Sequence, residues 1–129
     1  MCGIIGITEK NEPLVQNAAK LLGHRGPDAF GIFADDQVTL GHNRLSIIDL
    51  DNRSNQPMAD ASGSLTVVYN GEIYNYKEVR ERLEKKGYVF RTQSDTEVLL
   101  YAYKEWGKGL GGELNGMFAF ALWDRTQEV

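Results

Sequence analysis

The sequence predicts an α+β fold built from antiparallel strands and helices. Short segments rich in apolar and β-branched residues recur along the chain, bounded by Gly, Pro, Asn and Asp, and such segments are typical of antiparallel strands. Between them lie segments whose apolar residues have helical spacing. With 129 residues, 42% of them apolar and 25% charged, the chain has the composition of one globular domain or part of one.

The first half of the chain predicts three strands and one helix. Ile4, Ile5 and Ile7 can anchor an opening strand. A short amphipathic helix should follow from Pro13 to Gly23, because Pro is favoured at the start of a helix and Gly after its end. Segments 30–34 and 38–48 indicate two antiparallel strands, and the Asp-Asp pair between them indicates the turn.

The second half begins with an apolar strand over residues 65–69 that should end abruptly at Asn70-Gly71. A helix is expected next, because Asn75 and Glu78 have the spacing of a capping box and the apolar stripe stops at Gly87. A brief strand is predicted at 88–90.

The last third contains a second pair with cap spacing, Ser94 and Glu97, which predicts a helix as far as Trp106. Segment 108–112 is too rich in glycine to hold a helix on its own. Segment 117–123 predicts a strand buried on both faces, followed by a turn. Because a returning strand is expected at that point, we expect the chain to be an incomplete domain, truncated at the C-terminus.

The single cysteine, Cys2, follows the initiator methionine. Removal of Met1 would leave a thiol and a free α-amine on one residue, with ordinary pKa values of roughly 8.5 and 8, so the amine can accept the proton of the thiol. The structural alternative is a small apolar residue that opens a strand. The glycine and isoleucines that follow favour an anchored N-terminal nucleophile.

Two further groups of residues have the chemistry of a substrate site. Asn70 and Gly71 can supply a side-chain amide and a backbone N–H as an oxyanion hole, although an Asn-Gly pair is also typical of a hairpin turn. Arg44 can bind a carboxylate, and Glu72 and Asp95 can bind an ammonium group. Together they would fit the head of an amino acid, although each can equally be a surface or helix-terminus residue.

Other features argue against several classes of protein. The two histidines, His24 and His42, lack the spacing of metal ligands around the cysteine, so no metal site is expected. Arg25 and Asp28 are instead expected to hold a loop close to Cys2. A net charge of −4 without a basic stripe argues against nucleic acid, and the absence of long apolar runs and of a secretory signal argues for a cytoplasmic protein away from the membrane.

Taken together, the motifs resemble the glutaminase domain of the class II glutamine amidotransferases, and more narrowly the group of glutamine-hydrolysing asparagine synthetases. The resemblance covers nearly the whole chain. The residues that carry it are Cys2-Gly3-Ile4, His24-Arg25-Gly26-Pro27-Asp28, Arg44-Leu45-Ser46-Ile47-Ile48-Asp49, Asn55-Gln56-Pro57-Met58, Asn70-Gly71-Glu72-Ile73-Tyr74-Asn75, Ser94-Asp95-Thr96-Glu97 and Leu114-Asn115-Gly116-Met117-Phe118-Ala119-Phe120.

The resemblance implies an N-terminal-nucleophile hydrolase fold, a four-layer αββα sandwich of antiparallel sheets, with residues 1–129 forming an incomplete glutamine amidotransferase type-2 domain. It implies hydrolysis of glutamine to glutamate and ammonia. The implied catalytic residues are Cys2, Asn70 and Gly71. The implied glutamine-binding residues are Arg44, Leu45, Ser46, Ile47, Ile48, Asn70, Gly71, Glu72 and Asp95.

By the same resemblance, no cofactor is expected in this chain, and ATP and Mg²⁺ belong to a synthetase domain that receives the ammonia and is absent from these residues. A second copy of the chain is a further possible partner, as a homodimer. The alternatives are the glutaminase domain of a paralogue in cell-surface polysaccharide or secondary-metabolite assembly, and a non-catalytic amidotransferase-like binding fragment. Glucosamine-forming and purine-pathway enzymes share the Cys-Gly-Ile start, but the motif from Asn70 to Asn75 favours the asparagine synthetase group.

Overall fold

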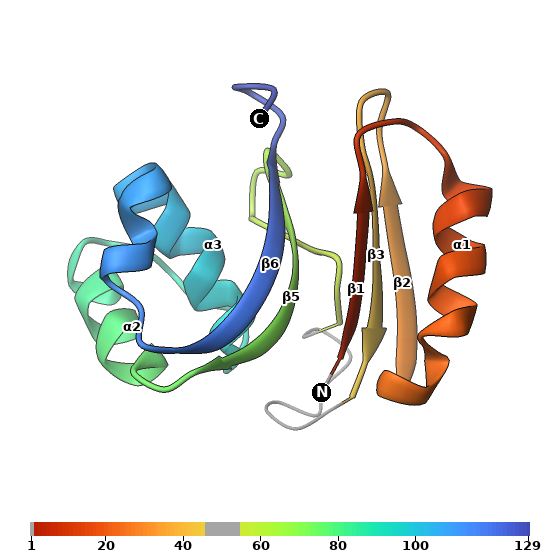
Figure 1. The fold of residues 1–129 in the computed structure, drawn as a ribbon. Coiled ribbons are helices and arrows are strands. Elements are labelled where there is room, and N and C mark those ends of the chain that lie inside the picture. The colour runs from red at the N-terminus through yellow and green to blue at the C-terminus, as the bar shows by residue number, and fades with distance from the viewer. Residues whose placement is uncertain (1, 46–54) are drawn as a thin grey trace.

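The computed structural model describes residues 2–45 and 55–129. Two three-stranded antiparallel sheets face each other, and helices cover the outer face of each sheet (Figure 1). The four layers are therefore helix, sheet, sheet and helices, which confirms the predicted αββα sandwich.

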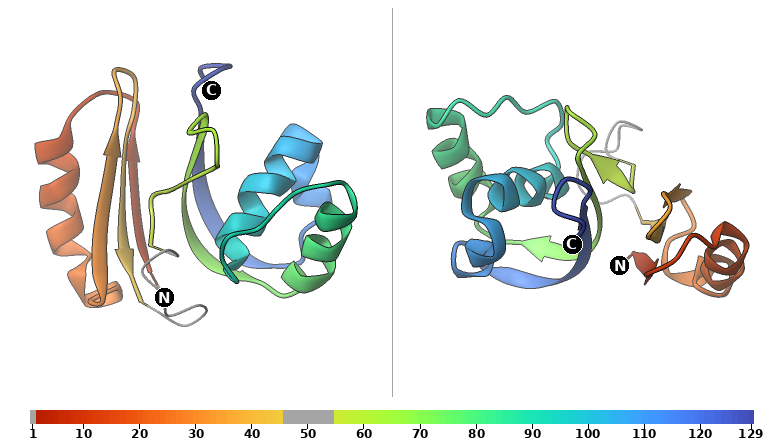
Figure 2. Two further views of the ribbon diagram at one scale, coloured as in Figure 1. Left: turned by 180° about the vertical axis from the view of Figure 1, so that it is seen from behind. Right: turned by 90° about the horizontal axis from the view of Figure 1, so that it is seen from above.

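The first sheet has the strand order β1-β3-β2, formed by β1 (Gly3–Ile7), β3 (Thr39–Arg44) and β2 (Ala29–Ala34). Helix α1 (Glu12–Leu21) packs along its outer face, followed by a 3₁₀ turn, η1 (Gly23–Arg25), as both views in Figure 2 show. The predicted helix is confirmed. Its N-terminus is capped by Asn11, whose side chain accepts a hydrogen bond from the Leu14 N–H at 3.1 Å.

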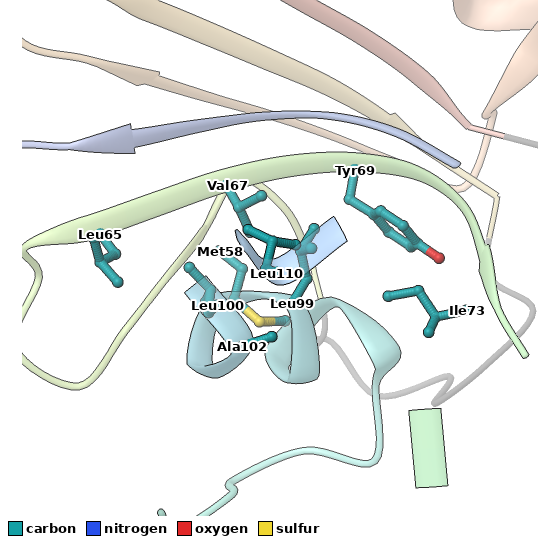
Figure 3. Packing of buried hydrophobic residues seen from close by; sticks show 9 residues of the cluster. All are labelled: Met58, Leu65, Val67, Tyr69, Ile73, Leu99, Leu100, Ala102 and Leu110. Carbon is teal, nitrogen blue, oxygen red and sulfur yellow. The ribbon is translucent and has the colours of Figure 1, made fainter. Parts of the chain in front are cut away.

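The second sheet has the order β4-β5-β6, formed by β4 (Met58–Ala59), β5 (Leu65–Ile73) and β6 (Gly116–Asp124). Its outer face is covered by α2 (Tyr76–Lys85), α3 (Asp95–Trp106) and the 3₁₀ helix η3 (Gly107–Gly112). The main apolar core lies between this sheet and α3 (Figure 3). Its buried members are Met58, Leu65, Val67, Tyr69, Ile73, Leu99, Leu100, Ala102 and Leu110.

A smaller apolar cluster lies between the two sheets and contains Leu40, Val68 and Trp123. The Trp123 indole also donates a hydrogen bond of 2.6 Å to Asp35 in the β2–β3 turn. Because Trp123 belongs to β6 and Asp35 to the turn that joins two strands of the first sheet, this bond joins the two halves of the sandwich.

Two strand predictions at the second sheet were wrong. β5 does not end at Asn70-Gly71 but continues to Ile73, paired with β6 along its whole length. β6 is not buried on both faces, because exposure alternates along much of it and the Met117 side chain is 72% exposed. β6 is an edge strand in the order β4-β5-β6. The continuous run of apolar residues led to the prediction of burial on both faces, which is typical of a central strand.

The prediction of a strand at residues 88–90 was also wrong, and the glycine-rich segment forms a helix with support from the core. Residues 88–90 form no strand among the described residues, and the rings of Tyr88 and Phe90 instead pack on Tyr101 at centroid distances of 5.2 and 5.0 Å. The glycine-rich segment after α3 does form a short 3₁₀ helix, because Leu110 is buried in the main core and holds it in place. The predicted strand 38–48 is observed as β3, and residues 46–48 lie outside the described residues.

Both predicted capping boxes were only partly right. Ser94 caps α3 by accepting a hydrogen bond from the Thr96 N–H at 3.0 Å, as expected. Glu97, however, accepts hydrogen bonds from the backbone N–H groups of Arg91 and Thr92. The Asn75 side chain makes no cap at α2 and instead bonds to the backbone of residues 113 and 115, which lead into β6.

Candidate active site

A cavity of about 320 Å³ opens at the end of the sandwich where β1 begins and β5 ends. Figure 1 shows these two strand ends at the same side of the molecule. Segments from both sheets and from the start of α3 contribute to the walls. The lining residues are Cys2, Arg44, Leu45, Gln56, Tyr69, Asn70, Gly71, Glu72, Tyr74, Ser94, Asp95, Thr96 and Met117.

Cys2 lies directly before β1, and the pairing of Gly3 with Asn43 brings it beside the end of β3. Its Sγ accepts a hydrogen bond from the Leu45 N–H at 3.4 Å and lies 3.7 Å from the Leu45 carbonyl oxygen, to which the thiol can donate. Arg25 donates to the Cys2 carbonyl oxygen at 3.3 Å, as expected for a residue that holds its loop near the thiol. The thiol is therefore anchored by backbone contacts at the cavity wall.

Arg44 ends β3 and is almost fully buried, with 5% of its surface exposed. Its guanidinium donates a hydrogen bond to the side-chain oxygen of Asn55. A guanidinium is planar, so this contact can fix the orientation of its plane at the cavity wall.

Asn70, Gly71 and Glu72 are successive residues of β5. Val68 packs between the sheets, so strand alternation places Asn70 and Glu72 on that same face. The side-chain oxygen of Asn70 is buried and has no hydrogen-bond partner within the part of the chain that the structure describes. A buried amide that is not fully satisfied is available to a ligand.

Asp95 is the first residue of α3 and is 4% exposed. Its Oδ2 accepts hydrogen bonds from the Tyr69 hydroxyl at 2.6 Å and from the Ile73 N–H at 3.2 Å. Burial raises the pKa of Asp95, and the nearby charge of Glu72 adds to the effect, although the two hydrogen bonds oppose it. Glu72 and Asp95 thus bring two carboxyl groups to one cavity.

Sequence reasoning missed Gln56, Tyr69 and Thr96 as parts of this site. Gln56 accepts a hydrogen bond of 2.6 Å from the Tyr69 N–H and donates one of 3.2 Å to the Thr96 hydroxyl. The only signal was that Gln56 and Thr96 belong to motifs that carry the family resemblance. No spacing rule predicts that these side chains meet, because β5 and α3 bring them together.

The structure therefore brings seven of the predicted site residues to one cavity. They are Cys2, Arg44, Leu45, Asn70, Gly71, Glu72 and Asp95. Ser46, Ile47 and Ile48 lie outside the described residues. Their predicted roles in binding glutamine rest on the family resemblance alone.

Two other kinds of functional feature are absent from the described ranges. In residues 2–45 and 55–129, no group of three His, Cys, Asp or Glu side chains is placed to hold a metal ion. Within the same ranges, none of the helices has the length and apolar character needed to cross a membrane.

The cavity combines one thiol, one cation, two carboxyl groups and a buried amide. A thiol is a nucleophile towards a carbonyl carbon once it loses its proton. An arginine and two carboxyl groups in one cavity have the charges that complement the carboxylate and ammonium of an α-amino acid. The arrangement can therefore bind an amino acid and attack a carbonyl in its side chain.

Comparisons with known proteins agree with this chemistry. A family model described as a glutamine amidotransferase domain matches residues 1–129. The chain is 43% identical to asparagine synthetase [glutamine-hydrolyzing] 1 of Bacillus subtilis and 39% identical to asparagine synthetase B [glutamine-hydrolyzing] of Escherichia coli, in both cases over 100% of this chain. It spans only 22% and 24% of the length of these relatives.

Among solved structures, the chain is similar to the glutamine phosphoribosylpyrophosphate amidotransferase from B. subtilis complexed with ADP and GMP. The TM-score is 0.79 at 22% identity, over 97% of this chain and 35% of that one. A second structure, described as the allosteric regulatory enzyme of purine biosynthesis, matches with a TM-score of 0.80 at 23% identity, over 97% of this chain and 36% of that one. These likenesses show the shared fold.

Proposed function

Because this chain belongs to the glutamine amidotransferase domain family, we propose that it hydrolyses glutamine and supplies ammonia to the formation of asparagine. The observation that carries the proposal is that the lone thiol, Cys2, lines the same cavity as Arg44 and two carboxyl groups from distant segments of the chain. The identity to glutamine-hydrolysing asparagine synthetases over the full chain supports the choice of substrate.

Substrate binding follows from the charges in the cavity. Arg44 pairs with the α-carboxylate of glutamine, and Glu72 and Asp95 hold the α-ammonium group. Backbone groups of Leu45, Ser46, Ile47 and Ile48 line the same pocket in the proposed mode. The side-chain amide of glutamine then points towards Cys2.

The chemistry begins after Met1 is removed, when the free α-amine of Cys2 takes the proton of its own thiol. The thiolate attacks the amide carbon, and the negative charge that develops on oxygen is stabilised by the Asn70 side chain and the Gly71 N–H. Collapse of this intermediate releases ammonia, with the proton returned by the amine, and leaves a γ-glutamyl thioester. Water hydrolyses the thioester to glutamate and restores the thiol.

The ammonia passes, in this proposal, to a synthetase domain like that of the relatives, where ATP and Mg²⁺ activate the acceptor carboxylate as an adenylate. A cytoplasmic location fits this metabolism. A homodimer is also proposed, and sedimentation of the natural full-length protein would test it.

The experiment is to measure glutamate release from glutamine by the natural full-length protein and by Cys2→Ala. We expect the variant to lose glutamine hydrolysis while it still binds glutamine and still forms amide from free ammonia. These two retained properties are the controls for folding. Glutamate release that survives in Cys2→Ala would refute the nucleophile assignment, and an unvaried protein that binds glutamine without hydrolysing it would indicate a binding module.

A further inference from the structure

Tyr69 is held by three side chains from three different parts of the chain. Its N–H donates to Gln56 at 2.6 Å, its carbonyl oxygen lies 3.2 Å from Nε2 of His42, and its hydroxyl donates to Asp95 at 2.6 Å. β4 pairs with β5 only at residues 66 and 67, so Tyr69 lies beyond the end of that pairing. At this position no β4 residue pairs with β5. The side chains of Gln56 and His42 bond to the backbone N–H and carbonyl oxygen of Tyr69 instead.

The ring of Tyr69 is fixed as firmly as its backbone. Only 3% of the residue is exposed, and the ring belongs to the main apolar core between β5 and α3. Figure 3 shows Tyr69 at the edge of this cluster, with its hydroxyl on the side of Ile73. The Ile73 N–H is the second donor to the same Asp95 oxygen.

Burial, together with the bond to Asp95, raises the pKa of Tyr69 far above its ordinary value. The hydroxyl therefore keeps its proton at neutral pH and can donate to Asp95. A fixed donor of this kind determines which way a carboxylate points.

We propose that Tyr69 is a positioning residue, whose hydroxyl orients the Asp95 carboxylate to receive the α-ammonium group of glutamine. The inference rests on the proposed function and adds to it a residue that touches Asp95 rather than the reacting atoms. Gln56 and His42 contribute indirectly to the orientation of Asp95, because they hold the backbone of Tyr69 from which the ring extends.

Several titratable and charged groups lie around the Asp95 carboxyl group. Glu72 on β5 disfavours its ionisation, whereas the Tyr69 hydroxyl and the backbone N–H of Ile73 favour it. Arg44 at the end of β3 lines the same cavity. Cys2 approaches from the start of β1. Loss of the Tyr69 hydroxyl would remove a donor that favours the ionised form, so a higher pH would be needed to keep Asp95 charged.

The test is Tyr69→Phe, which keeps the ring in the core and deletes only the hydroxyl. The matched control is Tyr103→Phe. Tyr103, on α3, also packs against the main core and donates to an aspartate, Asp124 at 3.4 Å, outside the cavity. Both are made in the natural full-length protein that also carries Cys2→Ala, so that bound glutamine is not consumed. Calorimetry then measures the affinity for glutamine and for its analogue without the α-amino group, 5-amino-5-oxopentanoate.

We expect Tyr69→Phe to weaken glutamine binding about tenfold, the usual effect of losing a hydrogen bond to a charged group, and to leave the binding of the analogue unchanged. The low-pH limit of glutamine binding should also move to higher pH. Tyr103→Phe should change none of these values. In the enzyme with Cys2 intact, Tyr69→Phe should raise KM for glutamine with little change in kcat.

Two results would overturn the proposal. One is unchanged affinity for glutamine with an unchanged pH limit, and the other is equal weakening of glutamine and the analogue, which would mean a general loss of packing. If the analogue does not bind at all, the proposal is tested by the low-pH limit of glutamine binding. A shift to higher pH supports it, and an unchanged limit refutes it. Failure of the proposed function would look different. Either glutamine would not bind the Cys2→Ala protein with intact Tyr69, or the unvaried protein would bind glutamine without releasing glutamate.

Discussion

Gly71 lies so close to the carbonyl oxygen of Met117 that a Cβ at this position would come within 2.2 Å of it. The φ angle of Gly71 is +153°, a backbone conformation that other residues rarely adopt. β6 therefore lies directly against the β5 residue that is proposed to supply an oxyanion-hole N–H. The close approach explains why a glycine occupies the centre of a strand.

Gly71→Ala should lower the free energy of unfolding by about 3 kcal/mol, because it adds backbone strain to a clash with a main-chain atom that cannot move aside. Denaturant unfolding of the natural full-length protein measures this loss. Gly109→Ala is the control, since a Cβ there would meet no atom within 4 Å. Equal stability of the two variants would show that β6 can shift away from Gly71.

His42 should make the fold sensitive to mild acid. It is fully buried, and burial lowers its pKa from 6.5 to about 4, so the folded state keeps it neutral. The unfolded chain takes up a proton below pH 6.5, and stability present above that pH is lost as the pH falls towards 4. Between pH 7 and pH 4.5 this one residue should cost about 2.5 kcal/mol.

His42→Gln removes the titration while its amide can still donate to the Tyr69 carbonyl oxygen. The drop in unfolding free energy between pH 7 and pH 4.5 should therefore be smaller in this variant than in the unvaried protein. His24→Gln, at an exposed position, should keep the original drop. An identical drop in His42→Gln would mean that other groups cause the acid sensitivity.

Glu97 should stabilise the turn that leads into α3. Its buried carboxylate accepts hydrogen bonds from the N–H groups of Arg91 and Thr92 and from the Thr92 hydroxyl, at 2.7 to 3.1 Å. Glu97→Gln replaces one acceptor oxygen by a donor and should cost about 2 kcal/mol. Thermal unfolding measures the effect, with Glu81→Gln on the exposed side of α2 as a control that should leave stability unchanged.

Arg44 should determine affinity for the substrate carboxylate. Arg44→Lys keeps the charge but loses the planar fork that donates to Asn55 and that is proposed to bind the substrate carboxylate. We expect KM for glutamine to rise about tenfold, since a hydrogen bond to a charged group is lost. Arg82→Lys is the control, because Arg82 pairs with Glu113 outside the cavity. An unchanged KM in Arg44→Lys would place the substrate carboxylate elsewhere.

Cys2 should be the sole site of labelling by a diazoketone analogue of glutamine, because the chain has one cysteine. Intact mass should show loss of Met1 and one adduct per chain, and excess glutamine should prevent the adduct. A retained Met1 together with efficient labelling would contradict the need for a free α-amine.

The sequence by itself predicted the three helices, most of the strands and the chemistry of the site. Periodic apolar residues and local caps such as Ser94 determine these features through neighbours a few positions away. The assignment of Cys2 as nucleophile is also a prediction from the sequence, because the position of Cys2 behind Met1 is a property of the chain and not of its packing. Met1 itself is outside the described residues.

Only the tertiary structure decided how these parts meet. β5 continues through Asn70-Gly71 because β6 pairs beside it, and residues 88–90 pack on Tyr101 instead of joining a sheet. The bond between Tyr69 and Asp95 joins residues 26 positions apart. Local periodicity reports which face of an element is apolar, but the partner of a buried polar group is set by long-range packing, which no short stretch of sequence encodes.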